Sequence, residues 1–538
     1  MFRQQAFASP YSARLWKTPT AFVTGLMLLV VFAVVIRAPF FDVPMITDEG
    51  GYAYVAHFWT GEYQLYRDIP FDRPQGIFFI YELIFWLVGS GVESLRLAAA
   101  VYNAGTALVL LLLVRRVFDS GTAWMSALLF AVLSASPSIE GFTANAELFA
   151  SLPLTAAALL TWRRRWAWAG FLSGVAFLIK PIGLSGLIFA VGWALVLRAS
   201  WRSILWAVLG FSLGPLFMLV HGYLIGWPYF WRAVVERKLI TDTVVSHNFV
   251  AQVTNLAGSL ANTSPAWLLP AALATLTHKT WHPRTRTFAW LWVISSLFGM
   301  AIGGHWSRHY YVQLVPVLSL MAGPGASQVL RSSRRLLSHK VVLGAAVLFV
   351  AIDLPLWFSA PKAVSEQIYD RPGYVLNEEV AAYVSDHTAE DDTIYVAFYQ
   401  AEIYYLAKRR NAVPQMYGYE LTASRDVYKR IVASIAQRKP AMVVWVQPPP
   451  PEYASPEEFE AVLLHGYEEV QQFSEGDPAT GEAHVVRVYA RTSRRSLSAL
   501  SAGAGFSRLF GLPLHSTSQD VPRATMWRMT LARVAQSP

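Results

Sequence analysis

Long apolar segments separated by short charged connections dominate the first 360 residues of the chain. A helix that crosses a membrane needs about 20 predominantly apolar residues. Segments that approach this length and composition lie at residues 20–38, 94–114, 121–138, 147–162, 166–182, 183–198, 203–225, 265–277, 287–303, 310–329 and 341–359. The pattern predicts a polytopic α-helical membrane domain of about eleven spans over residues 1–360.

The basic residues of the connections indicate how these spans are oriented. Every second connection is short and basic. Their charged residues are Arg3, Arg14, Lys17, Arg115, Arg116, Arg163, Arg164, Arg165, Arg198, Arg202, Lys279, Arg284, Arg286, Arg331, Arg334, Arg335 and Lys340. Because cytoplasmic loops are enriched in Lys and Arg, we expect the N-terminus to be cytoplasmic. The segments then expected outside are 39–93, 139–146, 226–264, 304–309 and everything after 360.

Two further segments bear on this topology. The apolar run 21–36 follows basic residues and is not followed by a small-residue cleavage site, so we expect it to stay as the first span. Residues 76–88 (GIFFIYELIFWLV) are apolar but short, and they contain Glu82. A length of about 10–14 residues is typical of an interfacial helix. We therefore predict an amphipathic helix on the outer surface here. The basic loops and the absence of eukaryotic signals separately predict a bacterial-type plasma membrane.

After residue 360 the pattern changes to short β-rich runs that alternate with helical ones. Residues 393–399, 441–446 and 485–489 are predicted strands. One helix is predicted to begin at Asn377. A second is predicted to begin at Pro456, because residues 455–458 (SPEE) form a capping box with Pro at the first helical position. This alternation predicts an extracytoplasmic α/β domain over 361–491. The Arg- and Ser-rich residues 492–538 are predicted to be a flexible basic tail that contacts anionic lipid.

Composition supports a membrane protein and excludes some other classes. The chain is 54% hydrophobic and 15% charged, whereas a soluble domain carries about 25% charged residues. The net charge of +9 resides largely in the short connections, so we expect no nucleic-acid partner. The chain has no cysteine, which excludes disulfides and thiolate metal sites.

The first predicted outer loop contains the most informative polar residues. The acidic pair Asp48 and Glu49 directly follows the first span, at the membrane edge, where ionisable groups are usually functional. A structural alternative is that both carboxylates complement the dipole at the N-terminus of a helix over 50–59. Residue type alone does not decide between these two interpretations.

Several sequence elements, taken in order, resemble a known superfamily. The first outer loop contains Ile46-Thr47-Asp48-Glu49-Gly50-Gly51-Tyr52 and later Arg73-Pro74-Gln75, and Glu93-Ser94-Leu95-Arg96-Leu97 opens the next span. Further elements are Ala146-Glu147-Leu148-Phe149 with Pro153, the glycine-rich run 170–181 ending in Lys180-Pro181, and His309-Tyr310-Tyr311 through Pro316. Together they resemble the GT-C glycosyltransferases, in the branch of the protein mannosyltransferases and the lipid A aminoarabinose transferase.

The resemblance implies a function and assigns roles to particular residues. Members of this superfamily transfer a sugar from a polyprenyl-phosphate donor to a glycan, lipid or protein acceptor. It implies that Asp48 is the general base and that Glu49 assists it, with Glu147 as a supporting acidic residue. It also implies that Tyr52 and Arg73 bind the donor phosphate. From their places at the outer ends of spans, we expect further phosphate contacts from Lys180, Arg308, His309 and Tyr310.

Some of these residues also have structural interpretations. Lys180 can extend to the interface from the end of its span, Glu147 can cap or orient its helix, and the 308–310 element can be an aromatic anchor at the interface. We find no dedicated metal motif, although Asp48, Glu49 and Glu147 could supply oxygen ligands to a divalent cation. The tyrosines Tyr395, Tyr399, Tyr404 and Tyr405 suit either sugar stacking or core packing.

Two other functional classes remain as alternatives. A transporter or flippase of lipid-linked sugars would show inverted repeats and broken helices near the midplane, and neither is evident in the sequence. A non-catalytic membrane scaffold with a glycan-binding outer domain is the other alternative. The ionisable residues gather at the predicted outer ends of spans, which favours chemistry at the outer membrane surface.

Overall fold

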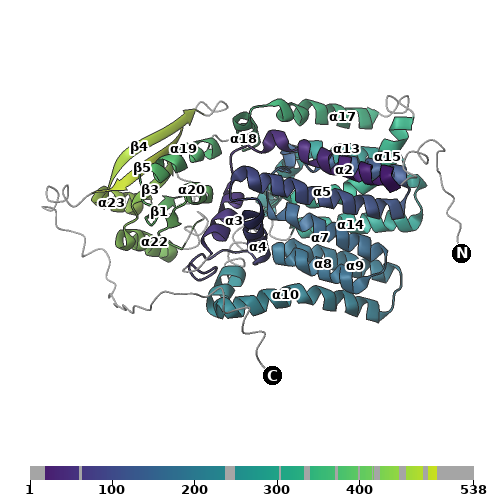
Figure 1. Cartoon of the computed structure of the whole chain (residues 1–538), viewed down its shortest axis with the longest axis horizontal. Coiled ribbons are helices and arrows are strands. Elements are labelled where there is room, and N and C mark those ends of the chain that lie inside the picture. Colours follow the sequence, from purple (N-terminus) through teal and green to yellow (C-terminus); the bar gives the residue numbers. More distant parts are fainter. Residues whose placement is uncertain are drawn as a thin grey trace, which may run out of the picture.

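A bundle of helices and a smaller sheet-containing domain make up the protein (Figure 1). The computed structural model describes residues 19–59, 63–236, 249–301, 305–331, 340–369, 373–397, 400–414, 416, 425–447, 456–476 and 483–492. The bundle helices α5, α7, α8, α9 and α10 run along a common direction, and the sheet lies beyond one end of them (Figure 1). The tail predicted for 492–538 lies outside the described residues apart from Thr492.

Every segment predicted to span the membrane contains a helix. The helices of the bundle and its outer loops are α2 (Pro19–Val35), α3 (Thr47–Phe58), α4 (Gly76–Leu87), α5 (Val92–Val117), α6 (Ser120–Leu133), α7 (Ala146–Trp162), α8 (Trp166–Ile179), α9 (Leu184–Val196), α10 (Trp201–Phe230), α12 (Phe249–Asn262), α13 (Ser264–Thr275), α14 (Pro283–Ala301), α15 (Val315–Arg331) and α17 (Lys340–Ile352). Helix α12 was not predicted from the sequence.

The number of spans is a separate question from the number of helices. Four helical stretches in the described residues are long and apolar enough to cross a membrane: Pro19–Phe40, Val92–Val117, Trp201–Glu236 and Lys340–Phe358. Several other predicted spans are apolar helices of 10–17 residues. The prediction of eleven spans is therefore not confirmed, because these helices are shorter than the roughly 20 residues that a bilayer requires.

Small residues allow α8 and α10 to pack closely. A side chain at Gly170 would overlap the carbonyl oxygen of Ala207, and a side chain at Gly174 would overlap that of Phe211. Close backbone approach at small residues is a common way to join helices in membranes, where apolar burial drives association only weakly. This packing holds α8 in place, and the residue after its last turn is Lys180.

Helix α4 forms where the sequence predicts a short apolar helix. One of its faces is buried through Ile77, Phe78 and Tyr81, whereas Trp86 on the other face is 80% exposed. Gly76 at its start lies directly against the backbone of Leu178 in α8. This contact joins the first outer loop to the end of α8.

The C-terminal domain contains a five-stranded mixed sheet of order β2-β1-β3-β5-β4. Its strands are β1 (Thr393–Ala397), β2 (Arg410–Asn411), β3 (Met442–Gln447), β4 (Tyr467–Gly476) and β5 (Ala483–Arg491). Strands β1, β2 and β3 pair in parallel, whereas β5 is antiparallel to β3 and to β4. The helices of this region are α18 (Pro361–Tyr369), α19 (Gly373–Asp386), α20 (Ala401–Leu406), α22 (Arg425–Arg438) and α23 (Pro456–Gly466).

The structure corrects two details of the prediction for this domain. Helix α19 begins at Gly373 and not at Asn377, because the apolar residues Val375 and Leu376 already pack in the core. Strand β4 was missed because its sequence, YEEVQQFSEG, is polar and mostly exposed, as expected at a sheet edge. Helix α23 begins at Pro456 as predicted, while Ser455 and Tyr399 lie outside the described residues. Tyr395, Tyr404 and Tyr405 are buried.

Candidate active site

Asp48 lies beside a cavity at the start of α3. It is in the first turn of this helix, and its side chain is 29% exposed. The cavity has a volume of about 650 Å³, and Asp48 is one of its lining residues. The Oδ2 atom of Asp48 lies 3.8 Å from Nε2 of His309. A partly exposed carboxylate beside an imidazole has the access that a general base needs.

The neighbouring Glu49 points in a different direction and is fully enclosed. Its Oε2 is 2.6 Å from an Nη atom of Arg96 in α5, and its Oε1 accepts a hydrogen bond of 2.6 Å from the backbone N–H of Ala144. Oε2 also accepts a longer bond from the Ile46 N–H, as in a capping box. Glu49 thus connects α3, α5 and the loop before α7, and its carboxylate does not line the cavity.

His309 lies among three carboxylates. It belongs to the 3-10 helix η6 (Arg308–Gln313), in the connection between α14 and α15. Its Nδ1 is 2.9 Å from Oε2 of Glu140, and its Nε2 is 3.8 Å from carboxylate oxygens of both Asp48 and Glu147. Burial lowers the pKa of His309, but the carboxylates, Glu147 first, outweigh it and raise the pKa above its ordinary value. The imidazole therefore favours the charged form.

Lys180 and Glu147 form a buried ion pair behind His309. Lys180 follows the last turn of α8, and Glu147 is in the first turn of α7. The ammonium donates to Oε1 of Glu147 and lies 4.3 Å from the ring centre of Tyr310. The two side chains are 7% and 0% exposed, so Lys180 does not extend to solvent at the helix end.

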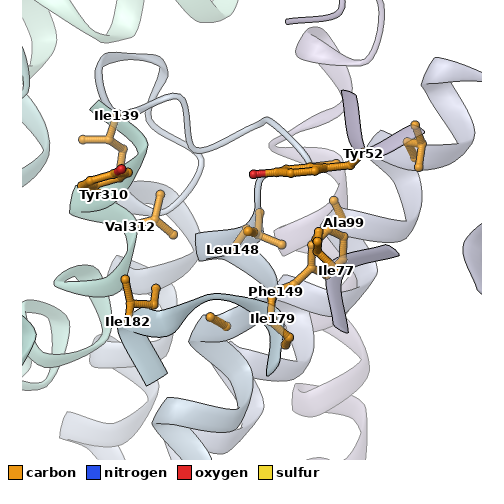
Figure 2. Close-up of a cluster of buried hydrophobic side chains, with 14 of the residues drawn as sticks. Tyr52, Ile77, Ala99, Ile139, Leu148, Phe149, Ile179, Ile182, Tyr310 and Val312 are labelled. Atoms are coloured by element: carbon orange, nitrogen blue, oxygen red, sulfur yellow. The ribbon is translucent and has the colours of Figure 1, made fainter. Parts of the chain in front are cut away.

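Arg73 and Tyr52 complete the group of predicted residues. Arg73 pairs with Asp72 at 2.5 Å and also interacts electrostatically with Asp48 and Tyr310. Tyr52 is buried one turn after Asp48, in contact with Phe71. Figure 2 shows the hydrophobic cluster to which Tyr52 and Tyr310 belong, with Tyr52 at one side, Leu148 and Phe149 of α7 between, and Tyr310 at the other.

Arg308 lines the cavity next to His309 and forms no ion pair with any residue that the structure describes. The opposite wall comes from the polar face of α12, through Thr254, Asn255, Ser259 and Asn262. Aromatic residues of the cavity are Trp306, Tyr369 and Tyr374. Hydroxyl, amide and aromatic groups of this kind can hydrogen-bond a sugar and pack against its ring.

Sequence reasoning missed Glu140 and the wall formed by α12. Glu140 has a left-handed backbone with φ 53°, follows the short helix η2 (Pro137–Ile139), and orients His309. The predicted outer loop 139–146 includes this carboxylate, so topology offered a signal that was not used. The sequence of α12 is amphipathic, with its polar and apolar residues repeating at helical spacing. This pattern was another unused signal.

The described residues contain no ligand cluster for the possible divalent cation. Among the described residues, no group of three or more His, Asp or Glu side chains has a metal-binding arrangement. The carboxylates near Asp48 instead neutralise His309 and Lys180.

Comparison with known proteins defines the fold. Residues 72–224 match the family model of the dolichyl-phosphate-mannose-protein mannosyltransferases. The structure is similar to that of ArnT from Cupriavidus metallidurans bound to undecaprenyl phosphate, with a TM-score of 0.53 and 17% identity over 88% of this chain and 98% of that one. The apo state of the same ArnT gives a TM-score of 0.51 over 87% and 98% of the two chains, again at 17% identity. No curated protein is a significant relative by sequence.

These findings identify the structural class of the protein. The chain has the fold of ArnT, which is that of the GT-C glycosyltransferases, and its described residues include four helical stretches long and apolar enough to cross a membrane.

Proposed function

We propose that the protein is a glycosyltransferase that moves a sugar from a polyprenyl-phosphate donor to an acceptor on the outer face of the membrane. The observation that supports this most is the position of Asp48. Its carboxylate is accessible from the cavity, and buried cationic side chains lie directly behind it. The similar ArnT structure is bound to undecaprenyl phosphate, which supports a lipid phosphate as the donor group.

Asp48 would act on the acceptor. In the transfer, an acceptor oxygen attacks the anomeric carbon of the sugar while the bond from that carbon to the phosphate oxygen breaks. Asp48 accepts the proton of an acceptor hydroxyl, and the polyprenyl phosphate leaves as an anion. His309 lies 3.8 Å from the carboxylate, close enough for a charged imidazole to attract and orient it.

The departing phosphate requires positive charge. Arg308 is at the cavity surface, and Lys180 and Arg73 lie deeper, where water is scarce and each charge has a larger effect. Planar Arg side chains suit phosphate because they donate two parallel hydrogen bonds. Tyr310, whose ring lies beneath the Lys180 ammonium, holds that cation in place. Tyr52 supports the same cluster from α3.

Glu49 and Glu147 take different roles in this proposal. Both are buried in ion pairs, with Arg96 and Lys180 respectively. Glu147 positions Lys180 and adds negative potential to His309, whereas Glu49 fixes the start of α3.

The acceptor is a glycan, lipid or protein of the cell envelope, and the membrane lipid surrounds the helices.

The test uses purified protein in detergent with a panel of polyprenyl-phosphate sugars and measures release of free lipid phosphate. Asp48→Asn should lower the rate by about 10²–10⁴-fold, the usual contribution of a general base, without loss of thermal stability. Asp42→Asn is the matched control, because Asp42 is an exposed carboxylate in the same outer segment. Release by Asp48→Asn at the wild-type rate would refute the proposal and favour the flippase or scaffold alternatives.

A further inference from the structure

The C-terminal domain packs directly on the helix that carries Asp48. Helix α20 lies against α3, and the contact is so close that a side chain at Gly50 would overlap the Cα of Glu402. The backbone N–H of Asn411 donates to the Tyr54 hydroxyl at 2.9 Å, and the Tyr405 hydroxyl donates to the backbone of Ser90. The domain is therefore fixed to the first outer loop at several points.

At the centre of this contact is a buried carboxyl group that the transfer reaction does not use. Glu402 is fully enclosed, and its Oε2 accepts a hydrogen bond of 3.0 Å from the Thr47 hydroxyl. Its Oε1 accepts one of 2.6 Å from the side-chain amide of Asn377 in α19. Thr47 is the first residue of α3 and directly precedes Asp48. A hydrogen bond at this residue fixes the turn from which Asp48 projects.

We propose that Glu402 is a positioning residue for Asp48, through which the C-terminal domain sets the geometry of the active site. This inference rests on the proposed function for its catalytic readout only. A displacement of about 1 Å at a reacting group can cost about 10²-fold in rate. Through the contact of Glu402 with Thr47, the C-terminal domain helps to set the position of Asp48.

The protonation state of Glu402 follows from its surroundings. Burial raises its pKa to about 8, and the charge of Asp48 acts in the same direction, against the opposing effect of its hydrogen bonds. Tyr374 of α19 also interacts electrostatically with Glu402, and burial raises the pKa of Tyr374, so its hydroxyl stays neutral in this range. In the neutral acid the protonated oxygen donates to the Thr47 hydroxyl, which then acts as the acceptor. A glutamine reproduces this arrangement, because its amide oxygen accepts from Asn377 and its NH₂ donates to Thr47.

The first experiment compares three variants in the lipid-phosphate release assay. Glu402→Ala should lower kcat by about tenfold to a hundredfold with little change in the KM for the donor, because the donor-binding cations are on other elements. Glu402→Gln should retain most of the wild-type kcat below pH 7. Glu390→Ala, at an exposed carboxylate of the same domain, should be unchanged. Equal kcat in Glu402→Ala and wild type would overturn the proposal.

A pH profile separates positioning from a merely structural role. The folded-state pKa of Glu402 lies above its unfolded value. The contribution of the neutral acid to the stability of the contact between α20 and α3 is therefore complete at low pH and is lost as pH rises through about 8. Wild-type kcat should fall above this pH, and the Glu402→Gln profile should stay level there. Identical profiles between pH 6 and 10 would contradict the inference.

A second variant reaches the same contact without altering either carboxyl group. Gly50→Ala should push α20 away from α3 and lower kcat as Glu402→Ala does, whereas Gly344→Ala on α17 meets open space and should have no effect. Hydrogen exchange over Thr47–Phe58 gives a readout that does not depend on catalysis. Exchange should rise in Glu402→Ala and Gly50→Ala and stay low in Glu402→Gln. If the wild type transfers no sugar but exchange behaves in this way, only the proposed function fails; unchanged exchange overturns the positioning role.

Discussion

Replacing Glu49 by alanine should lower the free energy of unfolding of the protein, although Glu49 is adjacent to the proposed general base. The carboxylate is 1% exposed and is the ion-pair partner of Arg96, which is itself fully buried. It also accepts the backbone N–H of Ala144, 95 residues away in sequence. The substitution therefore removes one charge of a buried pair and leaves the other without its partner.

The magnitude follows from these contacts. Breaking a buried ion pair by removing one partner costs about 3–5 kcal/mol, because the remaining charge stays desolvated. The unsatisfied Ala144 N–H adds about 1–3 kcal/mol unless water enters. Arg96 keeps its bond to the Phe40 carbonyl and its position over the Phe142 ring, which offsets part of this loss. We expect a net loss of at least about 3 kcal/mol, or more than a hundredfold in the folding equilibrium.

Thermal unfolding of the purified protein in detergent measures this effect. Glu93→Ala, an exposed acidic residue in the first turn of α5, is the control and should leave Tm unchanged. The double variant Glu49→Leu with Arg96→Met removes both charges and should recover most of the stability. A Glu49→Ala protein with wild-type Tm but no transfer activity would refute this reasoning and make Glu49 a direct participant in the chemistry.

Three further outcomes are expected. Lys180→Met should abolish lipid-phosphate release and lower the free energy of unfolding by about 3–5 kcal/mol, measured as a fall in Tm, since it leaves Glu147 buried without its ion-pair partner; normal activity would exclude Lys180 from phosphate binding. The pKa of His309 is raised in the folded protein, so its contribution to stability is complete below pH 6.5 and is lost as pH rises through the raised value. Tm of His309→Gln should accordingly vary less with pH than the wild type, and equal slopes would contradict this. Gly170→Leu should destabilise the bundle, because a side chain there overlaps the backbone of Ala207, and an unchanged Tm would show that α8 and α10 can separate without cost.

Local sequence patterns were sufficient for several features of this protein. Each apolar segment contains a helix, and the runs at 393–399, 441–446 and 485–489 contain strands, because hydrophobic periodicity acts over neighbouring residues. The motifs around Asp48, Glu147, Lys180 and His309 indicated the GT-C fold, which the structural similarity confirms. The catalytic role of Asp48 and the membrane face on which it lies remain predictions.

Only the tertiary structure decided what the acidic residues contact. Asp48 and Glu49 are adjacent, yet one lines the cavity and the other binds Arg96, because successive residues of a helix point about 100° apart. Glu140 in the connection before α7, Glu147 in the first turn of α7 and His309 in η6 come together, and Glu402 reaches Thr47 across 355 residues. Such contacts depend on how the helices pack in three dimensions, which hydrophobic periodicity along the chain does not encode. The sequence determined the elements and the residue types of the site, and packing determined which side chains meet.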